Sequence, residues 1–182
     1  KRIALVVLVA LALVAGLFWL RDYRMEPAHG TLLTAVDSVG IYYHRDPSQR
    51  GKFGLEYECV EFVNRWLVAY GHRNLAKTGH AISYFNEAKA KGLVSYANGG
   101  SVKPERGDVI TFKSAVQQYG HVGIVMEVGA DNVLVAQQNV TLRLWLVVKP
   151  MPFERFPLTN INDKWTVMPR RSFTCVGWSR PR

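Results

Sequence analysis

The segment from residue 54 to residue 71 places a cysteine on the first turn of an amphipathic helix. Its apolar residues recur at steps of three and four, which puts them on one helix face: Cys59, Phe62, Val63, Trp66, Leu67 and Tyr70. Unpaired N–H groups and the helix dipole stabilise a thiolate at a helix N-terminus, so we expect a lowered pKa for Cys59. The alternative is a small buried apolar residue, which most cysteines on apolar helix faces are.

The N-terminus carries Lys1 and Arg2 before an unbroken apolar run that ends at residue 20. As a helix this run would be about 27 Å long, just enough to cross a bilayer. The charged residues that follow make a poor cleavage site, so we expect an uncleaved transmembrane anchor over residues 1–20. Positive charges flank the run on both sides. The short N-terminal tail favours a single-pass membrane protein whose domain is extracytoplasmic, either periplasmic or facing the cell wall.

Residues 21–36 are predicted to be a linker, and residues 37–182 to form one domain with one hydrophobic core. A second helix is predicted over residues 81–91. Strands are predicted where β-branched runs are separated by turn signals, at residues 109–112, 121–128, 132–137, 141–148 and 173–178. Residues 149–171 contain several prolines and are expected to be irregular. Helices followed by strands indicate an α+β domain, with helices packed on one antiparallel sheet.

The chain has 23 Lys and Arg against 14 Asp and Glu, a formal net charge of +9. Such a charge suits an anionic polymer or a lipid headgroup surface as partner. The basic residues are scattered and no nucleic-acid-binding motif is recognisable, which argues against nucleic acid. The histidines lack paired ligand spacing and no Asp-rich calcium loop occurs, so neither a metal nor another cofactor is expected. Cys59 and Cys175 could form a disulfide in an oxidising compartment, which would remove the nucleophile.

A cysteine nucleophile needs a base, and a polar group that orients the base. Of the five histidines, His121 opens a predicted strand. Neighbouring glycines such as Gly123 would let a substrate backbone come close. The next predicted strand leads into Gln137, Gln138 and Asn139, and one of these amides could hydrogen-bond the imidazole.

Four blocks follow one another along the chain: YECVEF at 57–62, PERGDVI at 104–110, GHVGIV at 120–125 and QQN at 137–139. In this order they resemble the CHAP family of cysteine- and histidine-dependent amidohydrolases and peptidases. Within that family, the runs CVEFVNRWL, AQQNV and VGW most resemble the amidase domain of glutathionylspermidine synthetase/amidase. The resemblance implies a papain-like fold.

The resemblance also implies roles for individual residues. Cys59 takes the place of the nucleophile that forms a thioester, and His121 that of the base. Asn139 matches an asparagine of the family's E-x-N motif. His80 matches a small-residue block and is expected to line the cleft, the alternative being a surface histidine.

Two positions depart from the family pattern. Gln137 stands where the family usually has Glu, and Glu58 stands just before the nucleophile where it usually has Gln. A carboxylate next to a thiol raises the thiol pKa unless it is paired. We hypothesise that Glu58 pairs with His121 and supplies the carboxylate lost at position 137. If so, Glu58→Gln should damage turnover more than Gln137→Glu.

Together these features predict a membrane-anchored, monomeric cysteine amidase or endopeptidase. Peptidoglycan peptide is the first-choice substrate, because a basic domain held at a membrane would meet an anionic wall polymer. One alternative is a glutathionylspermidine-type amidase. Another, from a different functional class, is a non-catalytic wall-binding or adaptor module.

Overall fold

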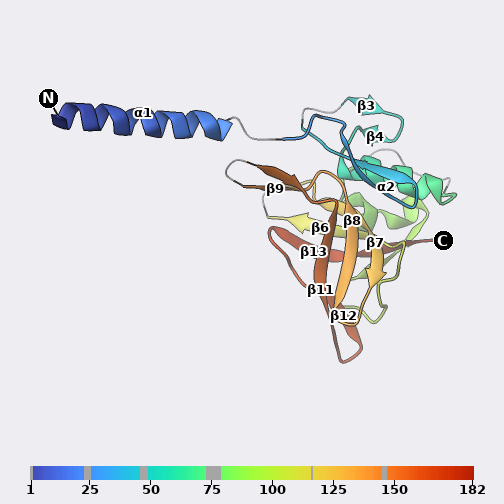
Figure 1. The fold of residues 1–182 in the computed structure, drawn as a ribbon. Coiled ribbons are helices and arrows are strands. Elements are labelled where there is room, and N and C mark those ends of the chain that lie inside the picture. The colour runs from blue at the N-terminus through green and yellow to red at the C-terminus, as the bar shows by residue number, and fades with distance from the viewer. Residues whose placement is uncertain (1, 23–25, 46–48, 73–78, 116, 145–146) are drawn as a thin grey trace.

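The computed structural model describes residues 2–22, 26–45, 49–72, 79–115, 117–144 and 147–182. The helices are α1 (Arg2–Asp22), α2 (Cys59–Ala69), α3 (Ser83–Asn86) and the 3-10 helix η1 (Ala88–Lys91). The strands are β1 (Leu32–Val36), β2 (Val39–Tyr42), β3 (Arg50–Gly51), β4 (Gly54–Leu55), β5 (Leu93–Ala97), β6 (Val109–Ser114), β7 (His121–Val128), β8 (Asn132–Gln137), β9 (Thr141–Arg143), β10 (Val148–Pro150), β11 (Phe153–Ile161), β12 (Lys164–Val167) and β13 (Phe173–Pro181). Figure 1 shows α1 leading away from the domain that the strands form.

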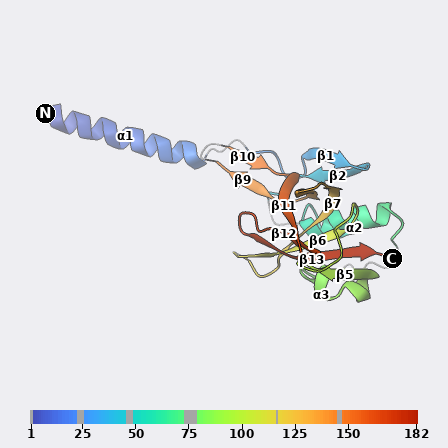
Figure 2. The ribbon, with the colours of Figure 1, turned by 90° about the horizontal axis from the view of Figure 1, so that it is seen from below.

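The domain is α+β and centres on one curled antiparallel sheet of seven strands. Their order is β12-β11-β8-β7-β6-β13-β5, and each strand runs antiparallel to its neighbours. Helix α2 packs against β7 and α3 packs against β13, so both helices cover the sheet (Figures 1 and 2). The three further strand pairs, β1–β2, β3–β4 and β9–β10, are antiparallel hairpins outside this sheet.

Both faces of the sheet are buried, each in its own apolar cluster. Successive side chains of a strand point to opposite faces. Ile124 of β7 therefore joins the cluster with α2, while Val125 joins the cluster on the other face. This second cluster contains Phe112, Phe156 and other side chains of β6, β8 and β11 to β13. The double burial explains why the central strands are nearly continuous apolar runs in the sequence.

The predicted transmembrane anchor over residues 1–20 is wrong. Crossing a bilayer as a helix takes about 20 consecutive apolar residues. Within the part of the chain that the structure describes, none of the helices is long and apolar enough to do so. The side chains described in α1, from residue 6 to residue 17, are exposed. This finding also overturns the predicted single-pass membrane location.

Other predicted elements differ in their extent. The helix expected over 81–91 is divided between α3 and η1, and Gly92 ends it in a left-handed conformation. The strand expected over 141–148 is the pair β9 and β10 instead, with residues 145–146 outside the described ones. The irregular stretch expected over 149–171 contains β11 and β12. Strand β11 pairs with β8 up to Pro157 and with β12 from Leu158 onward, so the proline lies where β11 changes partners.

Candidate active site

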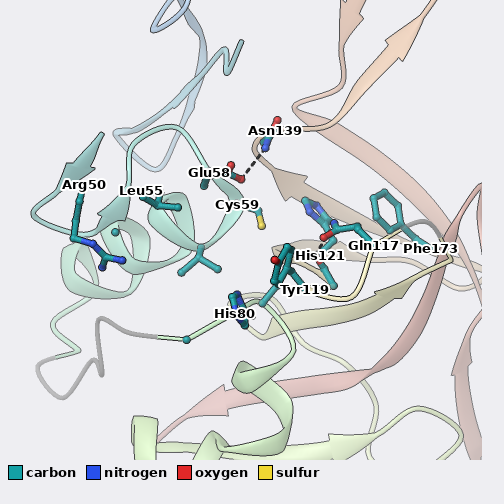
Figure 3. Close-up of a pocket in the computed structure, with 15 residues that line it drawn as sticks. Arg50, Leu55, Glu58, Cys59, His80, Gln117, Tyr119, His121, Asn139 and Phe173 are labelled. Atoms are coloured by element: carbon teal, nitrogen blue, oxygen red, sulfur yellow. Dashed lines mark hydrogen bonds between the residues drawn. The ribbon is translucent and has the colours of Figure 1, made fainter. Parts of the chain in front are cut away.

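A pocket of about 690 Å³ opens between the start of α2 and the start of β7. Its lining includes Glu58 and Cys59 from α2 and the turn before it, and His121 from β7. Asn139, which follows β8, and Phe173 of β13 complete one side. Figure 3 shows the Cys59 thiol and the His121 ring directed into the same space. The fold thus brings together residues more than sixty positions apart in the chain.

Cys59 is the first residue of α2, and its helix position comes from the turn before it. Tyr57 has a positive φ of 61°, and Glu58 is extended, so the helix cannot begin earlier. The thiol is free, as is that of Cys175. The two cysteines belong to the apolar clusters on opposite faces of the sheet, which accounts for the absence of a disulfide between them.

The predicted lowering of the Cys59 pKa is wrong. Burial raises the pKa of the thiol to about 12, and the charge of Glu58 adds to the increase. Backbone hydrogen bonds at Val122 and Val60 act in the opposite direction without outweighing burial. In the free protein Cys59 is therefore a thiol at neutral pH.

His121 is buried, with 3% of its surface exposed. Burial lowers the pKa of the imidazole to about 4, although a hydrogen bond with Gln137 raises it. Phe173 stacks on the ring with 4.9 Å between centroids. Removal from water disfavours the charged form of the ring, so His121 is a neutral base at neutral pH.

Gln137 is the amide that contacts the imidazole. Its Oε1 lies 3.0 Å from His121 Nε2. The strand pairing explains the contact, because Gln137 of β8 lies opposite Gly123 of β7, and Gly123 is two residues after His121. The Gln137 side chain is fully buried. This contact occupies Nε2 and leaves Nδ1 as the ring nitrogen available for other chemistry.

Glu58 and Asn139 form a second pair at the pocket wall. Asn139 Nδ2 donates a 2.7 Å hydrogen bond to Glu58 Oε2 (Figure 3). On the other carboxylate oxygen, His44 Nε2 lies 3.6 Å from Glu58 Oε1. Among the described residues, no hydrogen bond or ion pair joins Glu58 to His121. The geometry therefore does not give Glu58 the role hypothesised for it, and its charge acts on the thiol instead.

Two further residues singled out in the sequence occupy different places. His80 is exposed and lines the pocket, where its ring lies 4.4 Å from that of Tyr119. Gly123 lies within the sheet and is not among the residues that line the pocket. A Cβ at this position would come within 2.7 Å of the Ala136 backbone oxygen. Gly123 therefore allows close approach of strands rather than of a substrate backbone.

Gln138 fixes the start of α2 against the sheet. Its Nε2 donates to the Glu58 backbone oxygen at 3.0 Å and to Glu61 Oε2 at 3.0 Å. Its Oε1 accepts the Tyr42 backbone N–H at 2.8 Å. Arg65 adds a contact to the same oxygen at 3.2 Å. Gln138 thus holds the cysteine end of the helix between β2 and β8.

Sequence reasoning missed several residues that surround these groups. Arg50, Gln117 and Tyr119 line the pocket, and Glu154 lies behind Gln137. Glu154, Phe156 and Leu158 occupy every second position of β11 and are all buried. The sequence signal for Glu154 was therefore a charged residue at a position where the alternation predicts an apolar one. Over the described ranges, no group of three or more His, Cys, Asp or Glu side chains could hold a metal ion.

Replacing Glu58 by Gln is expected to lower the pKa of the Cys59 thiol. Gln keeps an oxygen that can accept from Asn139, but it removes the negative charge that raises this pKa. The measurement is the rate of iodoacetamide alkylation against pH, in a Cys175→Ala background. The matched control is Glu127→Gln, which removes the charge of an exposed carboxylate on β7 and should leave the pH dependence of alkylation unchanged. An unchanged or raised thiol pKa in Glu58→Gln would contradict this assignment.

Comparison with known proteins gives three similarities. The family model described as "CHAP domain" matches residues 50–139. A trypanothione synthetase from Crithidia fasciculata is 34% identical over 101 residues, which is 50% of this chain and 16% of that protein. The solved structure of an N-acetylmuramoyl-L-alanine amidase from Staphylococcus aureus has a TM-score of 0.47 and 15% identity, over 82% of this chain and 37% of that one.

The chain thus spans about a sixth of the curated relative's length, and the match to that relative concerns a part of it. The segment matched by the family model begins at β3 and ends at Asn139. It includes Cys59 and His121, which line the pocket, and Gln137, which contacts the His121 ring. The chain belongs to the CHAP domain family.

Proposed function

We propose that this protein is a cysteine amidohydrolase in which Cys59 attacks an amide carbonyl and His121 transfers the protons. Membership of the CHAP domain family supports hydrolysis of amide bonds. The observation that carries the proposal is the pocket itself, which a buried thiol and a buried imidazole both line. The Gln137 contact on Nε2 leaves Nδ1 free to serve as the base.

The first half of the reaction begins from two neutral groups. His121 Nδ1 takes the proton of the Cys59 thiol as the sulfur attacks the carbonyl carbon. The carbonyl oxygen gains negative charge, and the backbone N–H of Cys59 at the start of α2 is a donor for it. The C–N bond then breaks, the imidazolium returns its proton to the leaving amine, and a thioester remains on Cys59.

The second half releases the acid. A water molecule attacks the thioester carbonyl while His121 takes one of its protons. The C–S bond breaks, the proton passes to the sulfur, and the product leaves as a carboxylic acid. Both groups are neutral before the attack, so the site holds no thiolate–imidazolium ion pair until the proton is transferred.

Peptidoglycan peptide is the substrate class we propose first. The family assignment supports a hydrolase of this kind, and the net charge of +9 suits an anionic wall polymer. A second candidate is an amide between glutathione and a polyamine, favoured by the similarity to a trypanothione synthetase. The Glu58 carboxylate at the pocket wall, with 32% of the side chain exposed, offers a partner for a polyamine cation.

The test compares the two substrate classes on the same purified protein. Soluble peptidoglycan peptides and glutathionylspermidine are incubated separately, and newly formed amines are quantified, with Cys59→Ser as the blank for each. Turnover of wall peptides alone supports the first substrate, and turnover of the polyamine conjugate alone supports the second. Binding to wall material with no turnover of either would overturn the proposal in favour of a non-catalytic binding module.

A further inference from the structure

Glu154 is a buried carboxylate directly behind Gln137. It lies on β11, which pairs with β8, and its side chain is 1% exposed. Its Oε2 is 3.3 Å from Gln137 Nε2. The strand alternation that buries Phe156 and Leu158 also directs Glu154 inward, so the carboxylate lies under the site and not at the surface.

Two arginines form ion pairs with this carboxylate. A buried carboxylate is costly unless it is paired. Arg170 Nε lies 3.0 Å from Glu154 Oε1, and Arg171 Nε lies 3.1 Å from the same oxygen. Both arginine side chains reach solvent, with 46% and 33% exposed. Two guanidinium groups at ion-pair distance from one oxygen favour a carboxylate, whose oxygens accept hydrogen bonds and do not donate them.

An acceptor at this position determines which way the Gln137 amide points. Gln137 Nε2 lies between two acceptors, Glu154 Oε2 at 3.3 Å and the Met151 backbone oxygen at 3.2 Å. A flipped amide would place its oxygen against both of them. The amide oxygen must therefore face His121, and His121 Nε2 must carry the proton that this oxygen accepts.

We propose that Glu154, held by Arg170 and Arg171, is a positioning residue that keeps the proton of His121 on Nε2 and leaves Nδ1 free to take the thiol proton. This inference rests on the proposed function, because the tautomer matters for turnover only if His121 is the base. Glu154 would then supply the carboxylate that is missing at position 137, and it would act on the imidazole through the Gln137 side chain. A neutral Gln137 then passes on the orientation that a carboxylate would impose directly.

Glu154→Gln tests the proposal by removing the charge with little change of shape. The two arginine donors should take the new amide oxygen, so the new NH₂ faces Gln137. Gln137 is then drawn to turn its oxygen away from His121, which permits the Nδ1–H tautomer. We expect ¹⁵N NMR of the imidazole to show an increased Nδ1–H population, and kcat to fall about ten- to hundredfold with little change in KM.

The reciprocal exchange is the decisive variant. Gln137→Glu alone places two carboxylates about 3 Å apart, where one takes up a proton. Combining Gln137→Glu with Glu154→Gln puts a carboxylate directly on Nε2 and an amide between it and the arginines. We expect the double variant to return to the Nε2–H tautomer and to regain kcat to within a few-fold of wild type. Glu127→Gln, which breaks an exposed ion pair with Arg155, is the matched control and should change neither reading.

Several results would overturn the inference. They are an Nδ1–H tautomer in the wild type, loss of kcat in Glu154→Gln with the tautomer unchanged, or no recovery in the double variant. If Glu154→Gln does not fold, the same NMR reading is taken on Arg170→Gln/Arg171→Gln. There Glu154 can take up a proton and donate, so an unchanged tautomer would equally overturn the inference. Failure of the proposed function is separate, because it would appear as no turnover or as turnover that does not depend on Cys59, whereas the tautomer is read by NMR without substrate.

Discussion

Cys59→Ser lowers kcat/KM for amide hydrolysis by at least about 10⁴-fold, as expected when a covalent nucleophile is lost. A serine hydroxyl is a far weaker acid than a thiol, and the neutral imidazole behind it lacks the basicity to compensate. The measurement is amine release from the substrate that the wild-type protein turns over, at substrate concentrations above and below KM.

Cys175→Ala is the matched control for this loss. Cys175 is also free and buried, but it belongs to the apolar cluster on the opposite face of the sheet. Its replacement removes a sulfur atom from the core without touching the pocket, so kcat should stay within a few-fold of wild type. Equal losses in both variants would point to a general effect of cysteine replacement, and hydrolysis by Cys59→Ser at the wild-type rate would rule out the covalent mechanism.

The second large effect is on acid stability. Burial holds the pKa of His121 near 4, against an ordinary value of about 6.5 in the unfolded chain. Between these two values the unfolded chain binds more protons than the folded one, so stability rises with pH through this window and falls as the pH drops. His121 should therefore reduce the free energy of unfolding by roughly 2 to 3 kcal/mol on going from pH 7 to pH 4.5. Urea unfolding at both pH values measures the change.

His121→Gln isolates this contribution, because Gln does not titrate. The loss of stability between pH 7 and pH 4.5 should be smaller in His121→Gln than in wild type by that amount. His80→Gln is the control, since His80 is exposed at the pocket rim and its replacement should leave the wild-type dependence in place. The same pH dependence in all three proteins would mean that His121 is charged in the folded state.

The positions of the main elements could be predicted where periodicity and turn signals agree. The apolar face of α2 and the strands β6, β7 and β8 follow directly from such patterns. Strand β11 could not be recognised in this way, because Pro157 suggests an interruption. The proline is tolerated because β11 changes pairing partner at that residue, which is a property of the whole sheet.

The grouping of Cys59, His121 and Gln137 was predictable from the sequence, but the electrostatics of the candidate site were not. Sequence proximity placed Glu58 beside Cys59, yet the chain direction before α2 turns this carboxylate toward Asn139 and His44. The helix N-terminus suggested a lowered thiol pKa, and burial has the opposite and larger effect. Both errors have one cause: local sequence gives the neighbours along the chain, whereas pKa values depend on neighbours and solvent in three dimensions.

The Gln138 contacts have a consequence for the smallest fragment that could work. The family match begins at residue 50, but Gln138 Oε1 is held by the Tyr42 backbone, and Arg65 donates to the Gly40 oxygen at 2.7 Å. At the other end, the chain that reaches Glu154 and stacks Phe173 on the imidazole lies beyond residue 139. A protein trimmed to the matched segment would keep the reacting side chains and lose what orients them. An expression boundary should therefore be drawn upstream of β2 and downstream of β13.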